Sequence, residues 1–323
     1  MTQKVFVTRP IPRAAVELLS SYDVTVHPSD AALKPPELGE ACRDAAGMLC
    51  VAVRVNEEVL SQTPHLKVVA NCGVGYDNID VEACTRRGIV VTNTPDAVTE
   101  ATADLAFALL LAVSRRVVEL DRTVREGRWQ RWEFGSFWGS EVHHKTLGIV
   151  GFGRIGRALA RRARGFGMRV LYHSRRRAEE SLERELSATC VDLKTLLAES
   201  DFVSLHVPHA RETHHLIGAS ELAQMKPLAF LINTSRGKVV DENALVEALQ
   251  ARRIAGAGLD VYEHEPHLHP ELPKLDNVVL LPHVGSATAE TRMKMATCAA
   301  ENLIAALEGR RPPNLVNPEV YRG

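Results

Sequence analysis

The sequence lacks an excess of charge of either sign. Its 323 residues include 39 Lys or Arg and 40 Asp or Glu, which leaves a formal net charge of -1. Strongly basic nucleic-acid-coating proteins and proteins with acidic tails are therefore disfavoured. We expect no nucleic-acid partner for this chain.

Long apolar runs are also missing. The most apolar stretch, residues 105–113, follows Asp104 and ends before Arg115. It is shorter than the roughly 18–20 residues that a membrane-spanning helix needs. The first residues, Met-Thr-Gln-Lys-Val-Phe-Val, run into a strand-like pattern without the apolar core of a signal peptide. We therefore expect a cytoplasmic protein with no membrane partner.

Recognisable metal motifs are absent as well. The six cysteines include no C-x-x-C pair, so we interpret them as reduced thiols. His264, His267 and His269 lie close together, but in a proline-containing loop without further ligands at a metal-binding spacing. We expect no metal.

Aromatic residues make up only 5% of the chain, yet all three tryptophans, with Phe134 and Phe137, fall within residues 128–139. A segment this short cannot bury five rings in itself. Two interpretations remain open, a partner surface or lid on the one hand and a plug between domains on the other. The segment follows a long helical pattern over residues 99–127, which Thr99 can cap and Gly127 can end.

What the sequence does contain is a regular alternation of short apolar runs and helical patterns, which is typical of βαβ units and parallel sheets. The strand-like runs form two series, residues 5–7, 24–26, 47–51, 67–70 and 89–91, and then residues 147–150, 169–172, 202–205, 229–232, 256–259 and 278–280. The pattern predicts an α/β protein with two doubly wound, Rossmann-like domains. Since the last helical pattern, residues 289–307, follows the second series, we expect it to return to the first domain. We predict domains of residues 1–98 with 287–323, and of residues 99–286.

A glycine-rich turn opens the second series. Gly151-Phe-Gly153-Arg154-Ile155-Gly156 directly follows the run 147–150 and precedes a helical pattern. In such a turn the first glycine permits the sharp bend, the second lets the backbone approach a pyrophosphate, and the third allows close helix packing. The helix N-terminus then offers N–H groups to the phosphates. This context predicts a dinucleotide site.

The end of the next strand predicts which dinucleotide is preferred. An enzyme that uses NAD places an Asp or Glu there for the ribose 2′-hydroxyl, whereas this chain reads Ser174-Arg175-Arg176-Arg177. A guanidinium suits a 2′-phosphate because it donates two charge-assisted hydrogen bonds. We therefore expect Ser174, Arg175 and Arg176 to favour NADPH over NADH.

Three polar patches follow later strands of the second series, and they carry Arg236, Glu265 and His283. Ligands of open α/β sheets bind outside the carboxyl ends of the strands, where these patches should meet. Reduction of a 2-keto acid needs a cation for the substrate's carboxylate and an acid that protonates the carbonyl oxygen. Arg236 suits the first role and His283 the second, while Glu265 would hold the imidazole oriented and protonated.

The motifs Asn-Thr-Ser-Arg236-Gly-Lys-Val-Val-Asp, Asp-Val-Tyr-Glu-His-Glu265-Pro and Leu-Pro-His283-Val-Gly-Ser, with the glycine turn upstream, carry a family resemblance. They resemble the D-isomer-specific 2-hydroxyacid dehydrogenases, and most of all the glyoxylate/hydroxypyruvate reductases. The resemblance covers essentially the whole chain. It implies a flavodoxin-like substrate-binding domain, a dinucleotide-binding domain, an active-site cleft and a homodimer formed through residues 99–139.

The resemblance also implies roles for further residues. Val74 and Gly75 follow the first-domain run 67–70 in a glycine turn that has Asn78 where a dinucleotide loop needs its third glycine. They are expected to cradle the substrate's carboxylate through backbone N–H groups, and Arg54 on a neighbouring loop is expected to face the same substrate. The implied cofactor-lining positions are Thr102, Val207, Pro208, Thr213, Thr234, Ser235, Asp260 and Gly285. Trp138 is expected to enter the partner subunit's cleft.

Several alternatives stay open. Phosphite dehydrogenases share the same Arg, Glu and His but carry Lys in place of Val74. Phosphoglycerate dehydrogenases often have a further regulatory domain and prefer NAD, and formate dehydrogenases replace the equivalent of Glu265. A 2-ketogluconate oxidoreductase remains possible, as does a non-enzymatic dinucleotide sensor similar to the transcriptional corepressors of this family.

Overall fold

The computed structural model describes residues 2–321. The chain divides into two compact units, which we call unit 1 (Met1–Val98 and Ser286–Gly323) and unit 2 (Thr99–Gly285). Each unit is an α/β layer structure with a parallel sheet at its centre. Within residues 2–321, no helix combines the length and the apolar composition needed to cross a membrane.

Unit 1 contains a five-stranded sheet in the order β2-β1-β3-β4-β5. This is the flavodoxin-like order, and every neighbouring pair is parallel. Its strands are β1 (Lys4–Val7), β2 (Asp23–Val26), β3 (Gly47–Cys50), β4 (Val68–Asn71) and β5 (Val90–Thr92). The helices are α1 (Arg13–Glu17), α2 (Pro35–Ala41), α3 (Glu57–Ser61), α4 (Val81–Arg86) and α12 (Ala289–Leu307), with a 3-10 turn η4 (Pro318–Tyr321).

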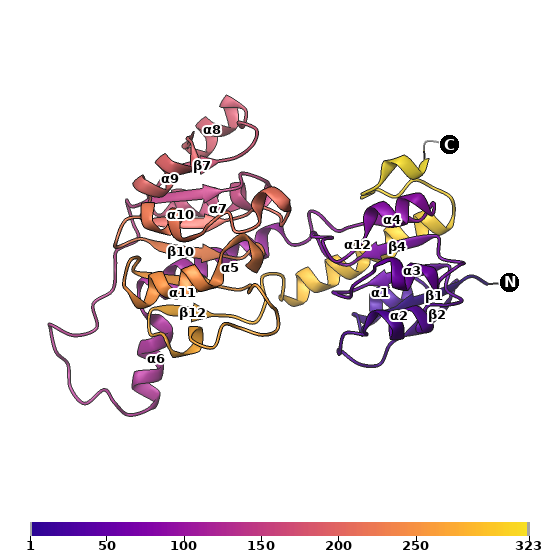
Figure 1. Ribbon diagram of the computed structural model, residues 1–323, viewed down its shortest axis with the longest axis horizontal. Helices are drawn as coiled ribbons and strands as arrows, with labels where there is room; N and C mark the ends of the chain where they lie inside the picture. Colours follow the sequence, from indigo (N-terminus) through magenta and orange to yellow (C-terminus); the bar gives the residue numbers. More distant parts are fainter. Residues whose placement is uncertain (1, 322–323) are drawn as a thin grey trace. The chain divides into compact units, whose positions relative to one another are not determined.

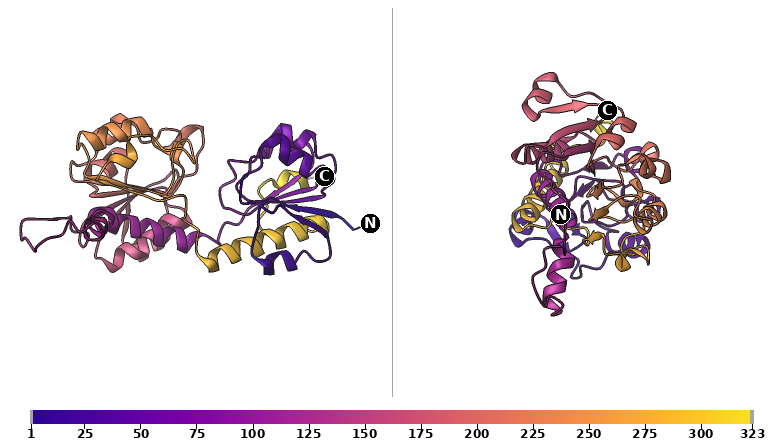
Figure 2. Two further views of the ribbon diagram at one scale, coloured as in Figure 1. Left: turned by 90° about the horizontal axis from the view of Figure 1, so that it is seen from below. Right: turned by 90° about the vertical axis from the view of Figure 1, so that its left-hand side faces the viewer.

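Helices lie on both faces of this sheet (Figures 1 and 2), and each face carries an apolar core. One core joins the sheet to α2, α3 and α4 through side chains such as Leu38, Leu60 and Cys84. The other joins it to α12 and the end of α1 through Leu19, Leu303 and Leu307. Helix α12 thus returns to unit 1 from the far end of the sequence.

Unit 2 contains a seven-stranded sheet in the order β12-β11-β10-β9-β6-β7-β8, again entirely parallel. Its strands are β6 (Thr146–Val150), β7 (Arg169–His173), β8 (Ala188–Cys190), β9 (Phe202–Leu205), β10 (Phe230–Asn233), β11 (Gly256–Leu259) and β12 (Val278–Leu280). The order is the Rossmann order with one strand added at the edge. The prediction of two doubly wound parallel-sheet domains is therefore confirmed.

Helices cover both faces of this second sheet (Figure 2). One face carries α5 (Thr99–Ser114), α7 (Arg154–Gly165) and α8 (Glu180–Leu186). The other carries α9 (Leu193–Glu199), α10 (Ala219–Gln224) and α11 (Glu242–Gln250). The connections add α6 (Val117–Arg125) and the 3-10 turns η1 (Arg211–Thr213), η2 (Gly237–Val239) and η3 (Leu272–Lys274).

The single helix predicted over residues 99–127 is wrong, because the chain forms α5 and α6 with a break between them. Arg116 at the break has a left-handed backbone, and its guanidinium holds the Glu119 carboxylate and the carbonyl of Trp138. Thr99 is not the predicted cap, since its hydroxyl is buried without a partner. Gly127 does end α6, at a φ of 68° that favours glycine.

The helices differ in whether a side chain caps their N-terminus. In α3, α4, α9, α11 and α12 the N-cap side chain accepts a first-turn N–H, and the residues that do so are Asn56, Asp80, Asp192, Asp241 and Thr288. The N-cap of α7 is Gly153, which makes no such bond. The positive end of α7 is therefore left for another acceptor.

Candidate active site

Three loops leave the same edge of the unit 2 sheet. Asn233 at the end of β10 is paired with Leu259 at the end of β11, and Leu259 is paired with Leu280 at the end of β12. Because the strands end in register, the loops that follow them begin side by side. These loops carry Arg236, Glu265 and His283.

The Arg236 loop is shaped by two residues that have no charge. The Asn233 side chain is buried, accepts from the N–H and hydroxyl of Ser235, and donates to the carbonyl of Arg236 at 3.0 Å. Gly237 lies so close to the next loop that a Cβ there would overlap the carbonyl group of Tyr262. Glycine is thus required for the close approach of the Arg236 loop to the loop that carries Glu265.

Glu265 and His283 are in direct contact. Nδ1 of His283 lies 2.7 Å from Oε2 of Glu265, and the side chains are 50% and 33% exposed. The other oxygen of Glu265 accepts the N–H of Tyr262 at 3.0 Å. The carboxylate thereby fixes the ring orientation and leaves Nε2 of His283 as the ring nitrogen available to a substrate.

The charge of Arg236 contributes to the pKa of Glu265. Burial raises this pKa, but the hydrogen bond and charge of His283, the Tyr262 N–H and the charge of Arg236 outweigh burial and lower it below its ordinary value. Glu265 is consequently a carboxylate at neutral pH. Glu265 and His283 are thus in contact within unit 2, and Arg236 lies close enough for its charge to act on Glu265.

Asp260 supports the turn that presents His283. Its side chain is only 1% exposed, and its two oxygens accept the N–H groups of Val284 and Gly285 at 2.7 and 2.8 Å. His283 itself has a φ of 54°, a left-handed conformation that costs a non-glycine residue about 1–3 kcal/mol. Burial raises the pKa of Asp260, and the two N–H groups oppose that rise. Sequence reasoning placed Asp260 only at the cofactor and missed this positioning contact.

The glycine turn between β6 and α7 has the geometry that its spacing predicts. Gly151 has a φ of 96°, and a Cβ there would meet the carbonyl oxygen of His206 at 2.6 Å. A Cβ on Gly156 would overlap the carbonyl oxygen of Gly151, whereas one on Gly153 would meet nothing within 4 Å. Only the middle glycine therefore faces open space, at the uncapped start of α7, where Arg154 and Ile155 form the first turn.

The three arginines after β7 differ in their surroundings. Arg177 is paired with Glu183 at 2.8 Å, and the Tyr172 hydroxyl donates to the same carboxylate, which lowers the pKa of Glu183 to about 2. Arg175 and Arg176 are exposed. Ser174 is half-buried beside them. Arg177 is exposed as well, but its guanidinium is held by Glu183 within the same connection.

Some of the remaining predicted cofactor positions have a side chain that is already hydrogen-bonded within the protein, and others do not. Thr213 stabilises its own loop, because its hydroxyl donates to the carbonyl of Pro208 at 2.7 Å and accepts the N–H of Ala210 at 2.8 Å. Thr102 is likewise occupied, since its hydroxyl donates to the carbonyl of Gly285 at 3.2 Å. Thr234, just beyond β10, is buried and its hydroxyl has no partner. Val207 lies half-buried after β9, next to Gly151 of the glycine turn.

Unit 1 places its predicted substrate residues on two tied loops. After β4, the Asn71 side chain donates to the carbonyls of Gly73 and Gly75 and so holds the glycine turn around Val74. After β3, Arg54 is exposed. Asn78 joins the two loops, because its side chain donates to the carbonyl of Val53 at 2.7 Å.

A family model for the NAD binding domain of D-isomer specific 2-hydroxyacid dehydrogenases matches residues 107–285. This match covers more than half of the chain and contains the glycine turn, Arg236, Glu265 and His283. The chain belongs to this family. It is an NAD(P)-dependent dehydrogenase with a nicotinamide dinucleotide as its cofactor.

Curated relatives and solved structures agree with the family. A glyoxylate reductase of Thermococcus litoralis is 54% identical over 99% of this chain and 98% of its own length. A glyoxylate reductase of Pyrococcus horikoshii is 52% identical over 100% and 98%. The crystal structure of an NADPH-dependent glyoxylate/hydroxypyruvate reductase from Sinorhizobium meliloti, in complex with NADP and malonate, has a TM-score of 0.87 at 36% identity and covers 99% of this chain and 98% of its own.

The dehydrogenase has two features that fit a dinucleotide. The open space above Gly153 lies at a helix N-terminus without a side-chain cap, which is the usual seat of a pyrophosphate. The buried, unpartnered hydroxyl of Thr234 lies at the carboxyl edge of the same sheet. Among residues 2–321, no group of three or more His, Cys, Asp or Glu side chains is arranged to hold a metal ion.

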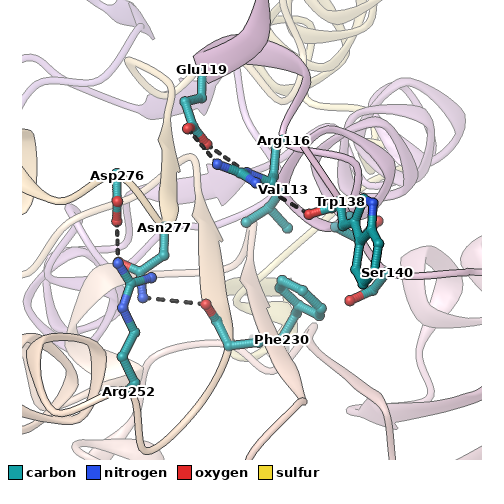
Figure 3. A pocket seen from close by; sticks show the side chains of 12 residues that line it. Val113, Arg116, Glu119, Trp138, Ser140, Phe230, Arg252, Asp276 and Asn277 are labelled. Atoms are coloured by element: carbon teal, nitrogen blue, oxygen red, sulfur yellow. Dashed lines mark hydrogen bonds and ion pairs between the residues drawn. The ribbon is translucent and has the colours of Figure 1, made fainter. Parts of the chain in front are cut away.

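A cavity of about 370 Å³ lies at the amino ends of the unit 2 strands, lined by the start of β10 and by residues just before β11 and β12 (Figure 3). Trp138 lines it together with Arg116 and Asn277. The Trp138 indole donates to the carbonyl of Phe134. The five aromatic side chains of residues 128–139 are between 43% and 79% exposed, and Figure 1 shows this stretch looping away from the sheet. Trp138 therefore does not lie at the edge that carries His283 in its own unit.

His206, next to the glycine turn, makes the stability of the dehydrogenase sensitive to acid. Burial lowers the pKa of His206 from 6.5 to about 4. Stability is therefore unaffected by this group above pH 6.5 and is lost as the pH falls from about 6.5 towards about 4, because only the unfolded chain takes up the proton. We expect His206→Asn to reduce the loss in unfolding free energy between pH 7 and pH 5 by about 2 kcal/mol, as measured by urea denaturation. His143→Asn, which changes an exposed histidine, is the control and should lose as much unfolding free energy as the wild type. The same loss in His206→Asn as in the wild type would show that His206 does not cause the acid sensitivity.

Proposed function

We propose that the protein is an NADPH-preferring reductase that converts small 2-keto acids of the glyoxylate/hydroxypyruvate class to D-2-hydroxy acids. The observation that carries the proposal is the 2.7 Å contact of His283 with Glu265, beside the charge of Arg236, at the carboxyl edge of the unit 2 sheet. The names of the relatives supply the substrate class, since the curated relatives described above are glyoxylate reductases.

The roles of the three side chains follow from their chemistry. When bound, the reduced nicotinamide supplies the hydride that the carbonyl carbon accepts. His283 donates a proton from Nε2 to the carbonyl oxygen, so that the C=O group becomes CH–OH. Glu265 holds the imidazole through Nδ1 and stabilises its protonated form. Arg236 binds the substrate's carboxylate and polarises its carbonyl.

The cofactor would be held by residues from α5 and from several loops of unit 2. The pyrophosphate belongs at Gly151, Gly153, Arg154, Ile155 and Gly156, where the start of α7 is uncapped. The 2′-phosphate belongs at Ser174, Arg175 and Arg176. The rest of the dinucleotide would be lined by Thr102, Val207, Pro208, Thr213, Thr234, Ser235, Asp260 and Gly285.

Unit 1 contributes to binding of the substrate in this proposal. Arg54 and the backbone N–H groups of Val74 and Gly75 are the groups assigned to the substrate's carboxylate. The ties that Asn71 and Asn78 make to these loops support the assignment, because they fix both loops at the carboxyl edge of the unit 1 sheet.

A homodimer formed through residues 99–139 is part of the proposal. The exposed aromatic side chains of residues 128–139 support it, because such a patch usually meets a partner. Sedimentation equilibrium of the purified protein tests it, and a monomer at micromolar concentration would contradict it.

The experiment that tests the function is a substrate panel. Purified protein is given NADPH or NADH with glyoxylate, hydroxypyruvate, pyruvate or 2-ketogluconate, or NADP with phosphite. We expect the highest kcat/KM with NADPH and glyoxylate or hydroxypyruvate. Turnover of phosphite alone would contradict the substrate class. Tight dinucleotide binding without any turnover would favour the non-enzymatic sensor.

A further inference from the structure

Arg175, just beyond the end of β7, meets a carboxylate from a different loop. Nη1 of Arg175 lies 3.4 Å from Oε1 of Glu212, and the side chains are 82% and 60% exposed. Glu212 comes from the turn η1, which follows β9. The two charges therefore meet across the ends of two strands of one sheet.

The position of Glu212 is built into its loop. Glu212 lies between Arg211 and Thr213, and the Thr213 hydroxyl bonds the carbonyl of Pro208 and the N–H of Ala210. These hydrogen bonds tie the Thr213 side chain to the main chain just before η1 and stabilise the turn. Glu212 is thus presented beside Arg175 by a fixed turn.

The neighbouring arginines do not share this arrangement. Arg177 is bound to Glu183 on α8, within its own connection. Arg176 is exposed, and within residues 2–321 no ion pair of Arg176 is found. Glu212 therefore acts on Arg175 and leaves Arg176 unchanged.

A carboxylate and a guanidinium at this place have opposite effects on the two nicotinamide dinucleotides. The 2′-hydroxyl of NADH needs an acceptor, which an NAD enzyme supplies as a carboxylate at the end of this strand. The 2′-phosphate of NADPH needs a cation, and a nearby carboxylate repels it and competes for that cation. The sequence has no Asp or Glu among residues 174–178.

We infer that Glu212 supplies the missing carboxylate from the neighbouring loop and so sets the cofactor specificity of this enzyme. Glu212 accepts a hydrogen bond from the ribose of NADH, and it weakens NADPH binding by holding Arg175. The preference for NADPH is consequently moderate, and the enzyme binds both dinucleotides. This inference rests on the proposed function, in which Arg175 receives the 2′-phosphate.

The test is Glu212→Gln in the full-length protein, read as the Kd of NADPH and of NADH by isothermal titration calorimetry without a keto acid. We expect the Kd of NADH to rise roughly three- to tenfold, because a charged acceptor is lost. The Kd of NADPH should fall roughly two- to fivefold, as expected for release from an exposed ion pair. The two constants thus move in opposite directions.

Glu199→Gln is the matched control. It removes the 2.9 Å ion pair of Glu199 with Arg169 at the opposite end of β7, where both side chains are also exposed. Neither Kd should change in this variant. Equal shifts in Glu199→Gln and Glu212→Gln would overturn the inference, because they would show a general effect of surface charge.

Arg175→Ala separates this inference from the proposed function. If Arg175→Ala weakens NADPH binding while Glu212→Gln leaves the ratio of the two Kd values unchanged, the inference about Glu212 is wrong and the proposed 2′-phosphate site stands. If neither variant changes the ratio, the assignment of the 2′-phosphate to Arg175 is wrong as well.

Discussion

His283→Ala should lower kcat for glyoxylate reduction by about 10²–10⁴-fold, the range expected when a general acid is removed. The loss should appear in kcat because the proton moves to the carbonyl oxygen only as the hydride arrives. The Kd of NADPH should stay near the wild-type value, since no step assigned to His283 involves dinucleotide binding. Steady-state kinetics with glyoxylate, together with a direct titration of NADPH, measure both quantities.

The control for His283→Ala is His143→Ala, which changes an exposed histidine that pairs only loosely with Glu141. It should leave kcat unchanged. Near-normal turnover in His283→Ala would reject the assignment of the general acid and would leave the role of the contact with Glu265 without a catalytic explanation.

Arg236→Ala should lower kcat/KM for glyoxylate by roughly 10²-fold, because charge-assisted hydrogen bonds to the substrate's carboxylate are lost. Both an increased KM and a decreased kcat are expected, since the guanidinium binds the carboxylate and polarises the carbonyl. Arg236→Lys should recover only part of the loss, because an ammonium keeps the charge but lacks the planar fork. NADPH affinity serves as the internal control and should not change.

An unchanged kcat/KM in Arg236→Ala would contradict the substrate-binding role. Lys238→Ala provides the matched comparison, because it removes an exposed cation two residues further along the same loop. A similar loss in both variants would indicate that the loop needs positive charge in general and that Arg236 has no specific contact with the substrate.

The topology could be predicted from the sequence because buried parallel strands read as short apolar runs between helical patterns. Each of the eleven predicted strand-like runs corresponds to a strand of the structure, with ends shifted by at most one residue. The short edge strand β8 was not predicted, since Ala188–Cys190 is too brief and too mixed in polarity to form an apolar run. The break at Arg116 was also not predicted, because it depends on contacts with Glu119 and with the distant Trp138.

The candidate site shows the same division. The placement of Arg236, Glu265 and His283 at one edge of the sheet could be predicted from the sequence, because parallel strands end at one edge of a sheet. The supporting contacts of Asn233 and Asp260 could not, since either side chain also suits a loop or a cofactor contact. The close approach of Gly237 to the backbone of Tyr262 could not be predicted either. A glycine that touches another backbone cannot be distinguished in the sequence from a glycine in an open turn.

Pairs between loops are the least predictable feature. Arg175 and Glu212 lie in different connections, and nothing in either local sequence indicates the other. The sequence therefore predicts a 2′-phosphate site in the basic run after β7 but not the carboxylate that faces it. The environments of the three adjacent arginines differ because η1 brings Glu212 to Arg175 and α8 brings Glu183 to Arg177.

The most direct test of the central claim is a double-mutant cycle between Glu265 and His283, read as kcat for glyoxylate reduction with saturating NADPH. If Glu265 acts through His283, Glu265→Gln lowers kcat by about tenfold or more in the wild type, but by less than about twofold in the His283→Ala background. The same fold-loss in both backgrounds would contradict the account, because the carboxylate and the imidazole would then act independently despite their contact.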